Sequence, residues 1–333
     1  MPTSRREILR TGTLAAAAML ASPFFTWAQA TAAADAKPGK GKKVLLFTKS
    51  QYFPHEAVTR KPKDDGTPGD TLAWGEQYFH DWATAAGYEV TISKEGNFFT
   101  PENVDKFDAF AFYTCGDLTQ PPGTKYPNND KTSPMTEAGK GALLKAIEAG
   151  KGFIGLHSAS DTFNIASHNA YPVKILPKGE KIDPFCMMLG AEFTSHASQQ
   201  EATVRVGSKA FPGLTDIQEF TTTEEWYAFT NMSPDLHVIF VQDTSTMKLV
   251  NGQREAPYRG DPYPNTWARL HGKGRVFYTS LGHREDVWTR PLYKQMVLAA
   301  LAWSTRVVEN DVKPNFAQAC PKIWAAGGTA TQP

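Results

Sequence analysis

Histidine is the residue type that most clearly suggests chemistry in this sequence. Four of its eight histidines, His55, His157, His196 and His283, lie where predicted strands or turns end. Neutral imidazole is the commonest protein ligand for metal ions, and it also transfers protons near neutral pH. A single histidine is more often structural, so the prediction depends on convergence. If several converge, they hold a divalent metal such as zinc or hydrogen-bond a polar ligand.

The stretch around His157 has the form of a catalytic turn. Gly152–Leu156 is a short apolar run, typical of a buried strand, and small polar residues follow it. Gly155-Leu156-His157-Ser158-Ala159 is spaced like a nucleophile elbow, but His157 stands where Ser or Cys would be. Serine-hydrolase and cysteine-amidotransferase chemistry are therefore disfavoured. His157 is expected to act by ligation, hydrogen bonding or proton transfer.

Carboxylates near these histidines supply candidate bases and further ligands. Asp161 follows His157 by four residues and either caps a turn, orients His157 or acts as a general base. If 221–227 is a strand, alternation puts Glu225 and Tyr227 on one face. On a crevice wall, Glu225 would have a raised pKa suited to proton transfer; on a solvent face it would be only an exposed charge.

Two further charged residues flank histidines. Glu56 follows His55, and Arg284 follows His283, where it either binds a substrate oxygen or pairs with Asp286. The candidate set is therefore catalytic His157, Asp161 and Glu225; substrate-binding Tyr227, Arg284 and Glu56; and metal-binding His55, His157, His196 and His283.

An α/β pattern is expected to position these residues. Continuous apolar runs predict strands at 43–48, 107–115 and 152–156, and alternation predicts one at 88–93. Helical periodicity separates these strands at 71–86, from Thr100, and at 136–150. This βαβαβαβ order predicts a doubly wound, mostly parallel sheet with helices on both faces. Ligands collect beyond the carboxyl ends of such strands, where three of the histidines fall.

The second half is less regular. Segment 161–180 is polar and is expected to be a loop that covers the strand ends. An antiparallel or edge strand is expected at 201–206, strands at 221–227 and 237–241, and a hairpin at 267–279. A last helix at 291–303 closes the sheet.

The N-terminus has the form of an export signal. Ser4-Arg5-Arg6 begins a twin-arginine pattern, and the apolar run 14–25 leads to the small-residue site Ala28-Gln29-Ala30. That run is shorter than the ~20 residues of a membrane span. The expected organisation is a signal peptide at 1–30, a linker at 31–42, an α/β domain at 43–305 and a tail at 306–333. The mature protein is expected to be periplasmic or secreted, with no membrane attachment.

Charge and composition exclude some partners. The 333 residues carry a formal charge of +1, and removal of the leader leaves 32 basic and 33 acidic residues, or −1. Such a balance gives no support for nucleic acid as a partner. No nucleotide-binding motif is present, so no nucleotide cofactor is expected. Of the three cysteines, Cys186 and Cys320 are the pair considered for a disulfide, and a homo-oligomer remains open.

Several segments, in order along the chain, resemble the trehalose-utilisation (ThuA-like) family, a branch of the class I glutamine amidotransferase-like superfamily. They are Phe53-Pro54-His55-Glu56, 155–162, 190–193 with His196, Glu224-Glu225-Trp226-Tyr227 and 274–283. The resemblance implies a flavodoxin-like fold without the amidotransferase cysteine, and so not a working glutamine amidotransferase. It also implies a link to carbohydrate catabolism that involves 3-keto sugars.

Two function classes follow from the residues and the resemblance together. The first is an exported enzyme that hydrolyses a sugar or keto-glycoside or cleaves it by elimination, with metal assistance as one option. A keto group acidifies the neighbouring C–H, so a modest base suffices for elimination. The second is a non-catalytic carbohydrate-binding or accessory protein on the same scaffold.

Overall fold

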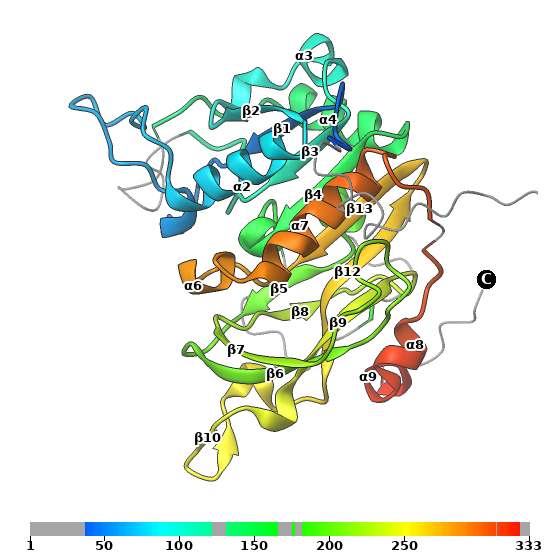
Figure 1. Ribbon diagram of the computed structural model, residues 1–333. Coiled ribbons are helices and arrows are strands. Elements are labelled where there is room, and N and C mark those ends of the chain that lie inside the picture. Colours follow the sequence, from blue (N-terminus) through cyan, green and yellow to red (C-terminus); the bar gives the residue numbers. More distant parts are fainter. Residues whose placement is uncertain (1–36, 122–130, 166–174, 177–181, 311, 327–333) are drawn as a thin grey trace, which may run out of the picture.

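The computed structural model describes residues 37–121, 131–165, 175–176, 182–310 and 312–326 (Figure 1). The expected signal peptide lies outside these residues, as do most of the expected linker and most of segment 161–180. Within the described part of the chain, the helices are too short or too polar to cross a membrane.

One nine-stranded sheet organises the molecule, in the order β2-β1-β3-β4-β13-β12-β9-β6-β7. Strands β1 (Lys43–Phe47), β2 (Glu89–Ser93), β3 (Ala109–Phe112), β4 (Gly152–Leu156) and β13 (Gly274–Thr279) are parallel. Their order is the flavodoxin-like one, so the predicted fold class is confirmed.

An antiparallel extension continues the sheet beyond β13. It consists of β12 (Tyr263–His271), β9 (His237–Asp243), β6 (Gln200–Val206) and β7 (Phe220–Glu224). The expected 267–279 hairpin corresponds to β12 and β13. The strand expected at 201–206 is antiparallel, but it is internal, because β7 covers its outer edge. Short strands β5 (Glu192–Ser195) and β8 (Ala228–Thr230) form a separate pair, as do β10 (Leu249–Val250) and β11 (Gln253–Arg254).

Two apolar cores lie on the two faces of the sheet. In β1, Val44 and Leu46 belong to one core and Leu45 and Phe47 to the other, as strand alternation requires. Helices α2 (Trp74–Ala85), α6 (Glu285–Trp288) and α7 (Pro291–Ser304) cover the first face. Helices α3 (Pro101–Asp105), α4 (Glu137–Glu148) and α5 (Pro184–Leu189) belong to the second (Figure 1).

Helix starts follow their local sequence signals. Thr136 accepts a hydrogen bond from the Gly139 N–H and caps α4, and Thr100 does the same for α3, which has Pro101 at its first position. The remaining helical segments are η1 (Glu56–Val58), η2 (Gly96–Phe98), η3 (His157–Asp161), η4 (Thr244–Thr246), η5 (Ala256–Tyr258), α8 (Phe316–Ala319) and α9 (Pro321–Ala326).

The tail packs on the antiparallel extension. Asn315 accepts a hydrogen bond from the Val238 N–H, and the Lys313 carbonyl lies 2.7 Å from His237 Nδ1. Cys115, Cys186 and Cys320 are free thiols. The Cys186–Cys320 disulfide considered from the sequence is therefore absent, although both residues belong to the same apolar core.

Gly282, between β13 and His283, is held in a conformation that a side chain would disturb. Its φ is +113°, and a Cβ there would lie 2.2 Å from Tyr293 Oη. Its N–H donates to Glu224 Oε2, and its carbonyl accepts from Trp288 Nε1 and Tyr113 Oη. The direction in which His283 leaves the sheet therefore depends on this glycine.

We expect Gly282→Ala to lower the free energy of unfolding by at least about 2 kcal/mol, through backbone strain and the Tyr293 clash. Chemical denaturation measures the change. The matched control is Gly141→Ala, which lies inside α4 with open space around its Cβ and should stabilise by up to about 1 kcal/mol. Equal effects of the two changes would contradict the assigned role of Gly282.

Candidate functional site

His157 is held at the tip of the turn that follows β4. Its φ is +41°, which is unusual for a residue with a side chain and typical of strained functional turns. Tyr278 Oη donates to the His157 carbonyl at 2.8 Å, and His157 Nδ1 lies 2.7 Å from the Ser280 carbonyl. The elbow inferred from the sequence therefore has the backbone conformation of an elbow, fixed by two bonds to β13 and the loop after it.

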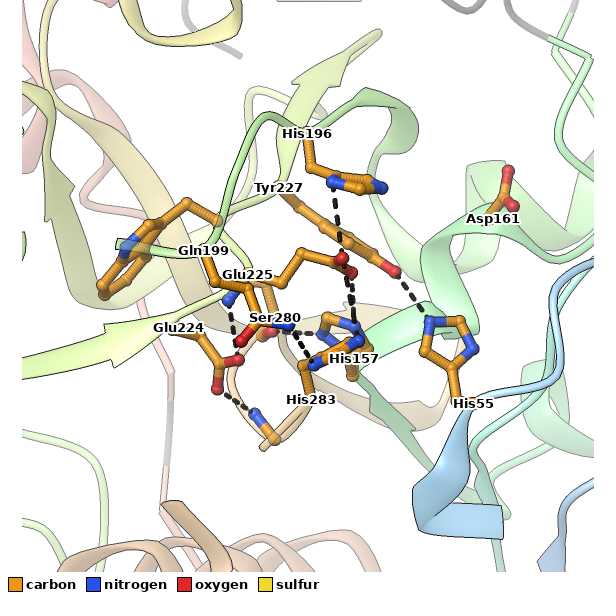
Figure 2. A network of polar contacts seen from close by, with 12 residues as sticks. His55, His157, Asp161, His196, Gln199, Glu224, Glu225, Tyr227, Ser280 and His283 are labelled. Carbon is orange, nitrogen blue, oxygen red and sulfur yellow. Dashed lines mark hydrogen bonds and ion pairs between the residues drawn. The ribbon is translucent and has the colours of Figure 1, made fainter. Parts of the chain in front are cut away.

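Three of the four predicted histidines converge with Glu225. One potential ligand atom each from His55, His157, His283 and Glu225 lies within 4.8 Å of all the others. The ring centroids of His55 and His157 are 5.1 Å apart, and those of His157 and His283 are 5.2 Å apart. Figure 2 shows the three rings grouped beside the Glu225 carboxylate. Donors from β1, β4 and β13 meet here because their strand ends share one edge of the sheet.

Glu225 connects the cluster to His196. Its Oε2 is 3.4 Å from His157 Nε2, and its Oε1 is 3.7 Å from His283 Nε2 and 3.4 Å from His196 Nδ1. His196 is not in the group of four. Its ring is 43% exposed and stacks on Tyr227 at 6.1 Å, so His196 borders the cluster from the solvent side.

The histidines of the cluster are neutral near pH 7. Burial is the largest cause of a lowered pKa for all three: to about 3 for His157, to about 4 for His283, and well below the usual value for His55. The repulsion that the other histidine charges would exert contributes further for His55 and His283. Neutral imidazole is the form that binds metals.

The hydrogen bonds of His157 orient its ring for ligation. Since a carbonyl only accepts, Nδ1 carries the proton and donates it to Ser280 O. Nε2 is then a lone-pair donor; it is buried, and it makes no hydrogen bond within the described residues. An unsatisfied buried nitrogen beside a carboxylate fits a cation between them, because a ligating His usually donates its second N–H to a carbonyl or carboxylate.

His283 is oriented from outside by Gln199. The Gln199 Nε2 lies 3.2 Å from His283 Nδ1, and the Gln199 Oε1 accepts from Arg284 Nη1 at 2.9 Å. Arg284 also pairs with Asp286 at 2.8 Å. Arg284 therefore holds the residue that orients His283, and its pairing with Asp286 is the second of the two roles expected of it from the sequence.

A cavity of about 300 Å³ opens beside the cluster. Phe53, at its wall, is 48% exposed although it is a large apolar side chain. Asp161 lies on this wall at a distance from the histidine group, as Figure 2 shows. The described residues that line the cavity are Tyr52, Phe53, His55, Cys115, Asp161, Phe193, Thr194, Ser195, His196, Glu225 and Tyr227.

The surroundings of Asp161 differ from the expectation. Ser280, not Asp161, orients His157, so the orienting role predicted for Asp161 is wrong. Asp161 Oδ2 accepts a hydrogen bond from Cys115 Sγ at 3.2 Å, and Oδ1 accepts from Asn164 Nδ2. Burial raises the pKa of the Cys115 thiol well above its usual value, so Cys115 is a protonated donor here and not a nucleophile.

Glu56 and the strand expected at 221–227 also differ from prediction. Glu56 is exposed in η1 and does not line the cavity. Strand β7 ends at Glu224, so strand alternation does not bring Glu225 and Tyr227 together. Both nevertheless reach the cavity, and Tyr227 Oη lies 3.4 Å from His55 Nε2.

Glu224 is a site residue that the sequence did not single out. It is fully buried, and its carboxyl accepts from the N–H groups of Glu225 and Gly282, both at 2.8 Å. Burial raises its pKa to about 8. The pair Glu224-Glu225 was the only feature of the sequence that could have indicated this residue. Which of the two carboxylates faces the cavity depends on where β7 ends.

Comparison with known proteins places this geometry in a family. The ThuA family model, described as trehalose utilisation, matches residues 43–304. The structure resembles a ThuA-like protein from Bacteroides uniformis, with 16% identity, TM-score 0.54, and 83% of this chain and 96% of that one covered. It also resembles one from Parabacteroides merdae, with 12% identity, TM-score 0.51, and 82% and 93% covered. These two likenesses concern the fold. No match was found among curated proteins.

Protonation of His283 should destabilise the protein in acid. Its pKa is about 4 when folded and ~6.5 when unfolded, so the unfolded state binds more protons between those values. Above pH 6.5 this histidine does not affect the free energy of unfolding, and as the pH falls from 6.5 toward 4 that free energy decreases. We expect His283→Gln to remove about 2 kcal/mol of the pH dependence of unfolding between pH 7 and 4.5.

Urea denaturation with a chelator present measures this slope. His80→Gln is the control, because the His80 side chain is 40% exposed, lies beside Asp81 and is distant in sequence from the cluster. A pH slope in His283→Gln equal to that of the parent protein would show that burial does not hold His283 neutral.

Proposed function

This chain belongs to the ThuA (trehalose utilisation) family, and from that premise we propose that it is a metal-assisted enzyme that cleaves keto-glycosides by elimination. One observation carries the proposal. His55, His157, His283 and Glu225 converge within 4.8 Å, and two of them, His55 and Glu225, line a cavity that Asp161 also lines. A set of neutral donors beside a cavity that holds a separate carboxylate is what carbonyl activation and proton removal require.

The donor set suits a divalent cation such as zinc. Three neutral imidazoles and one carboxylate are the ligand types that zinc accepts, and His157 Nε2 is a buried lone pair without a hydrogen bond in the described part of the chain. His55, His157, His283 and Glu225 would hold the ion. When bound, it would polarise a substrate carbonyl as a Lewis acid.

The cavity wall suits a sugar ring. Four aromatic side chains, Tyr52, Phe53, Phe193 and Tyr227, share the wall with carboxylates and hydroxyls. Aromatic faces bind the C–H faces of a sugar, while carboxylates and hydroxyls bond its OH groups. The exposed Phe53 at 48% is the natural surface for that contact.

The proposed reaction uses residues of this chain as follows. Asp161 removes the proton from the carbon between the keto carbon and the anomeric carbon. The electron pair moves into a C=C bond, and the keto oxygen takes the negative charge, toward which the Tyr227 hydroxyl donates. As the carbonyl re-forms, the anomeric C–O bond breaks, and water at the open mouth protonates the leaving oxygen. The products are an unsaturated keto sugar and an alcohol.

Tyr227 is suited to donate this hydrogen bond. Burial raises the pKa of its hydroxyl well above the usual value, and neighbouring carboxylates raise it further. The hydroxyl therefore stays protonated at neutral pH. Cys115 and Asn164 hold the Asp161 carboxylate, which Figure 2 shows at a distance from the histidine rings.

Metal content and base function can be separated by mutation. We expect the protein to bind about one equivalent of zinc or a similar ion, and His157→Ala and Glu225→Gln to lose it together with activity on 3-keto-glucosides. Asp161→Asn should retain the metal but lower kcat by about 100-fold or more, because a positioned base contributes about that factor. Elemental analysis and steady-state kinetics measure both.

Glu56→Gln is the matched carboxylate control and should behave like the parent protein, since Glu56 is exposed away from the cavity. Full activity of the metal-free protein would remove the metal from the proposal. Sugar binding without turnover of any keto-glycoside would favour a binding protein instead.

We also propose that the protein is exported by the twin-arginine route. Arg5 and Arg6 precede the apolar segment that would carry the signal. Replacement of both by Lys should retain the protein in the cytoplasm with an unprocessed N-terminus, as fractionation and N-terminal mass analysis would show. Processing and export of this double variant at the parent level would contradict the proposal.

A further inference from the structure

His196 borders a second hollow besides the cavity at the cluster. This hollow is larger, about 750 Å³, and lies between Ala197 and Ser198 on one side and the segment 250–259 on the other. Strands β10 and β11 form the projecting hairpin of that segment (Figure 1). Because His196 lines both spaces, they adjoin at the solvent side of Glu225.

Tyr258 connects the walls of the two cavities through hydrogen bonds. It is fully buried, and its hydroxyl accepts from the Ala197 N–H and donates to the Trp226 carbonyl, both at 2.8 Å. Trp226 lies between Glu225 and Tyr227, which line the first cavity. Both spaces therefore share one fixed wall.

A second set of bonds holds the hairpin side. Gln200 donates to Glu255 at 3.3 Å and accepts from the Lys248 N–H at 2.7 Å. Arg254 Nη2 donates to the Arg259 carbonyl, and Arg259 Nε donates to the Arg254 carbonyl, both at 3.1 Å. These two reciprocal hydrogen bonds hold the Arg254 and Arg259 side chains at the edge of the hollow.

The second hollow has hydrogen-bond donors and acceptors in its lining, beside the apolar Ala197, Val250, Ala256 and Pro257. Arg254 and Arg259 are donors, Glu255 is an acceptor, and Ser198, Asn251 and Gln253 are both. An occupant that presents many hydroxyl groups matches this lining, whereas an apolar one leaves it without partners.

The first cavity, at about 300 Å³, is at the small end of ligand sites and suits one sugar ring. Because His196 lines both spaces, the part of a larger glycoside that extends past His196 enters the second hollow. We infer that the hollow bordered by Ser198, Arg254 and Arg259 is a second subsite, which takes a polar leaving group such as a second sugar unit. This inference rests on the proposed function, because it names the substrate class of the same site.

Two substrates that differ only in leaving group test the inference: a methyl 3-keto-glucoside and the 3-keto derivative of a glucose disaccharide. The parent protein should prefer the disaccharide in kcat/KM. Arg259→Ala should lower that preference about 10-fold through the loss of a charged hydrogen bond, and Ser198→Trp should lower it further by filling the hollow. Arg290→Ala, outside both spaces, is the control.

A preference unchanged in both variants would overturn the subsite. Calorimetry with the unoxidised disaccharide and with methyl glucoside tests it without turnover. Weaker disaccharide binding in Arg259→Ala supports the subsite even if no keto-glycoside is cleaved, in which case only the reaction proposed above fails. Absence of disaccharide binding to the parent protein overturns the subsite.

Discussion

The buried Glu224 carboxyl is the contact on which the geometry of the site depends. It joins the end of β7, in the antiparallel extension, to the loop after β13, in the parallel half, through the N–H groups of Glu225 and Gly282. Glu225 is itself a member of the cluster, and Gly282 immediately precedes another member, His283. If this carboxyl shifts, an acidic and a basic member of the cluster separate. The antiparallel strands therefore complete a site that the flavodoxin-like half alone cannot form.

Burial makes the stability of this site depend on pH in two opposite directions. Because the pKa of Glu224 is raised from 4.5 to about 8, its contribution to stability is complete below pH 4.5 and is lost as the pH rises through 8. The lowered pKa values of His157 and His283 have the opposite sign, so their contribution is lost in acid. Burial thus keeps the histidines beside the Glu225 carboxylate neutral and lowers the stability of the folded protein. A cation bound to the folded state would offset this loss of stability.

The sequence predicts the parallel half of the fold because its signals there are local. Continuous apolar runs, Thr100 and Thr136 as helix caps, and the elbow at His157 each act within a few residues. The family assignment, made from ordered short segments, is confirmed over residues 43–304. The errors share another cause: Ser280 and Cys115, the partners of His157 and Asp161, are distant in the sequence. Glu56 and Arg284 were chosen because they follow histidines, and adjacency along a chain does not fix the direction of a side chain.

A histidine at the elbow position limits the catalytic roles that this residue can have. The strained backbone and the Ser280 bond direct Nε2 of His157 toward Glu225, so that nitrogen is available for ligation but has no substrate-facing position as a nucleophile. The cavity does contain a thiol, but Cys115 comes from the end of β3, and burial keeps it protonated as a donor to Asp161. Burial thus leaves this thiol unsuited to covalent catalysis. In the reaction proposed above, bond cleavage depends on polarisation and proton transfer, and a keto group beside the cleaved bond makes those two effects sufficient.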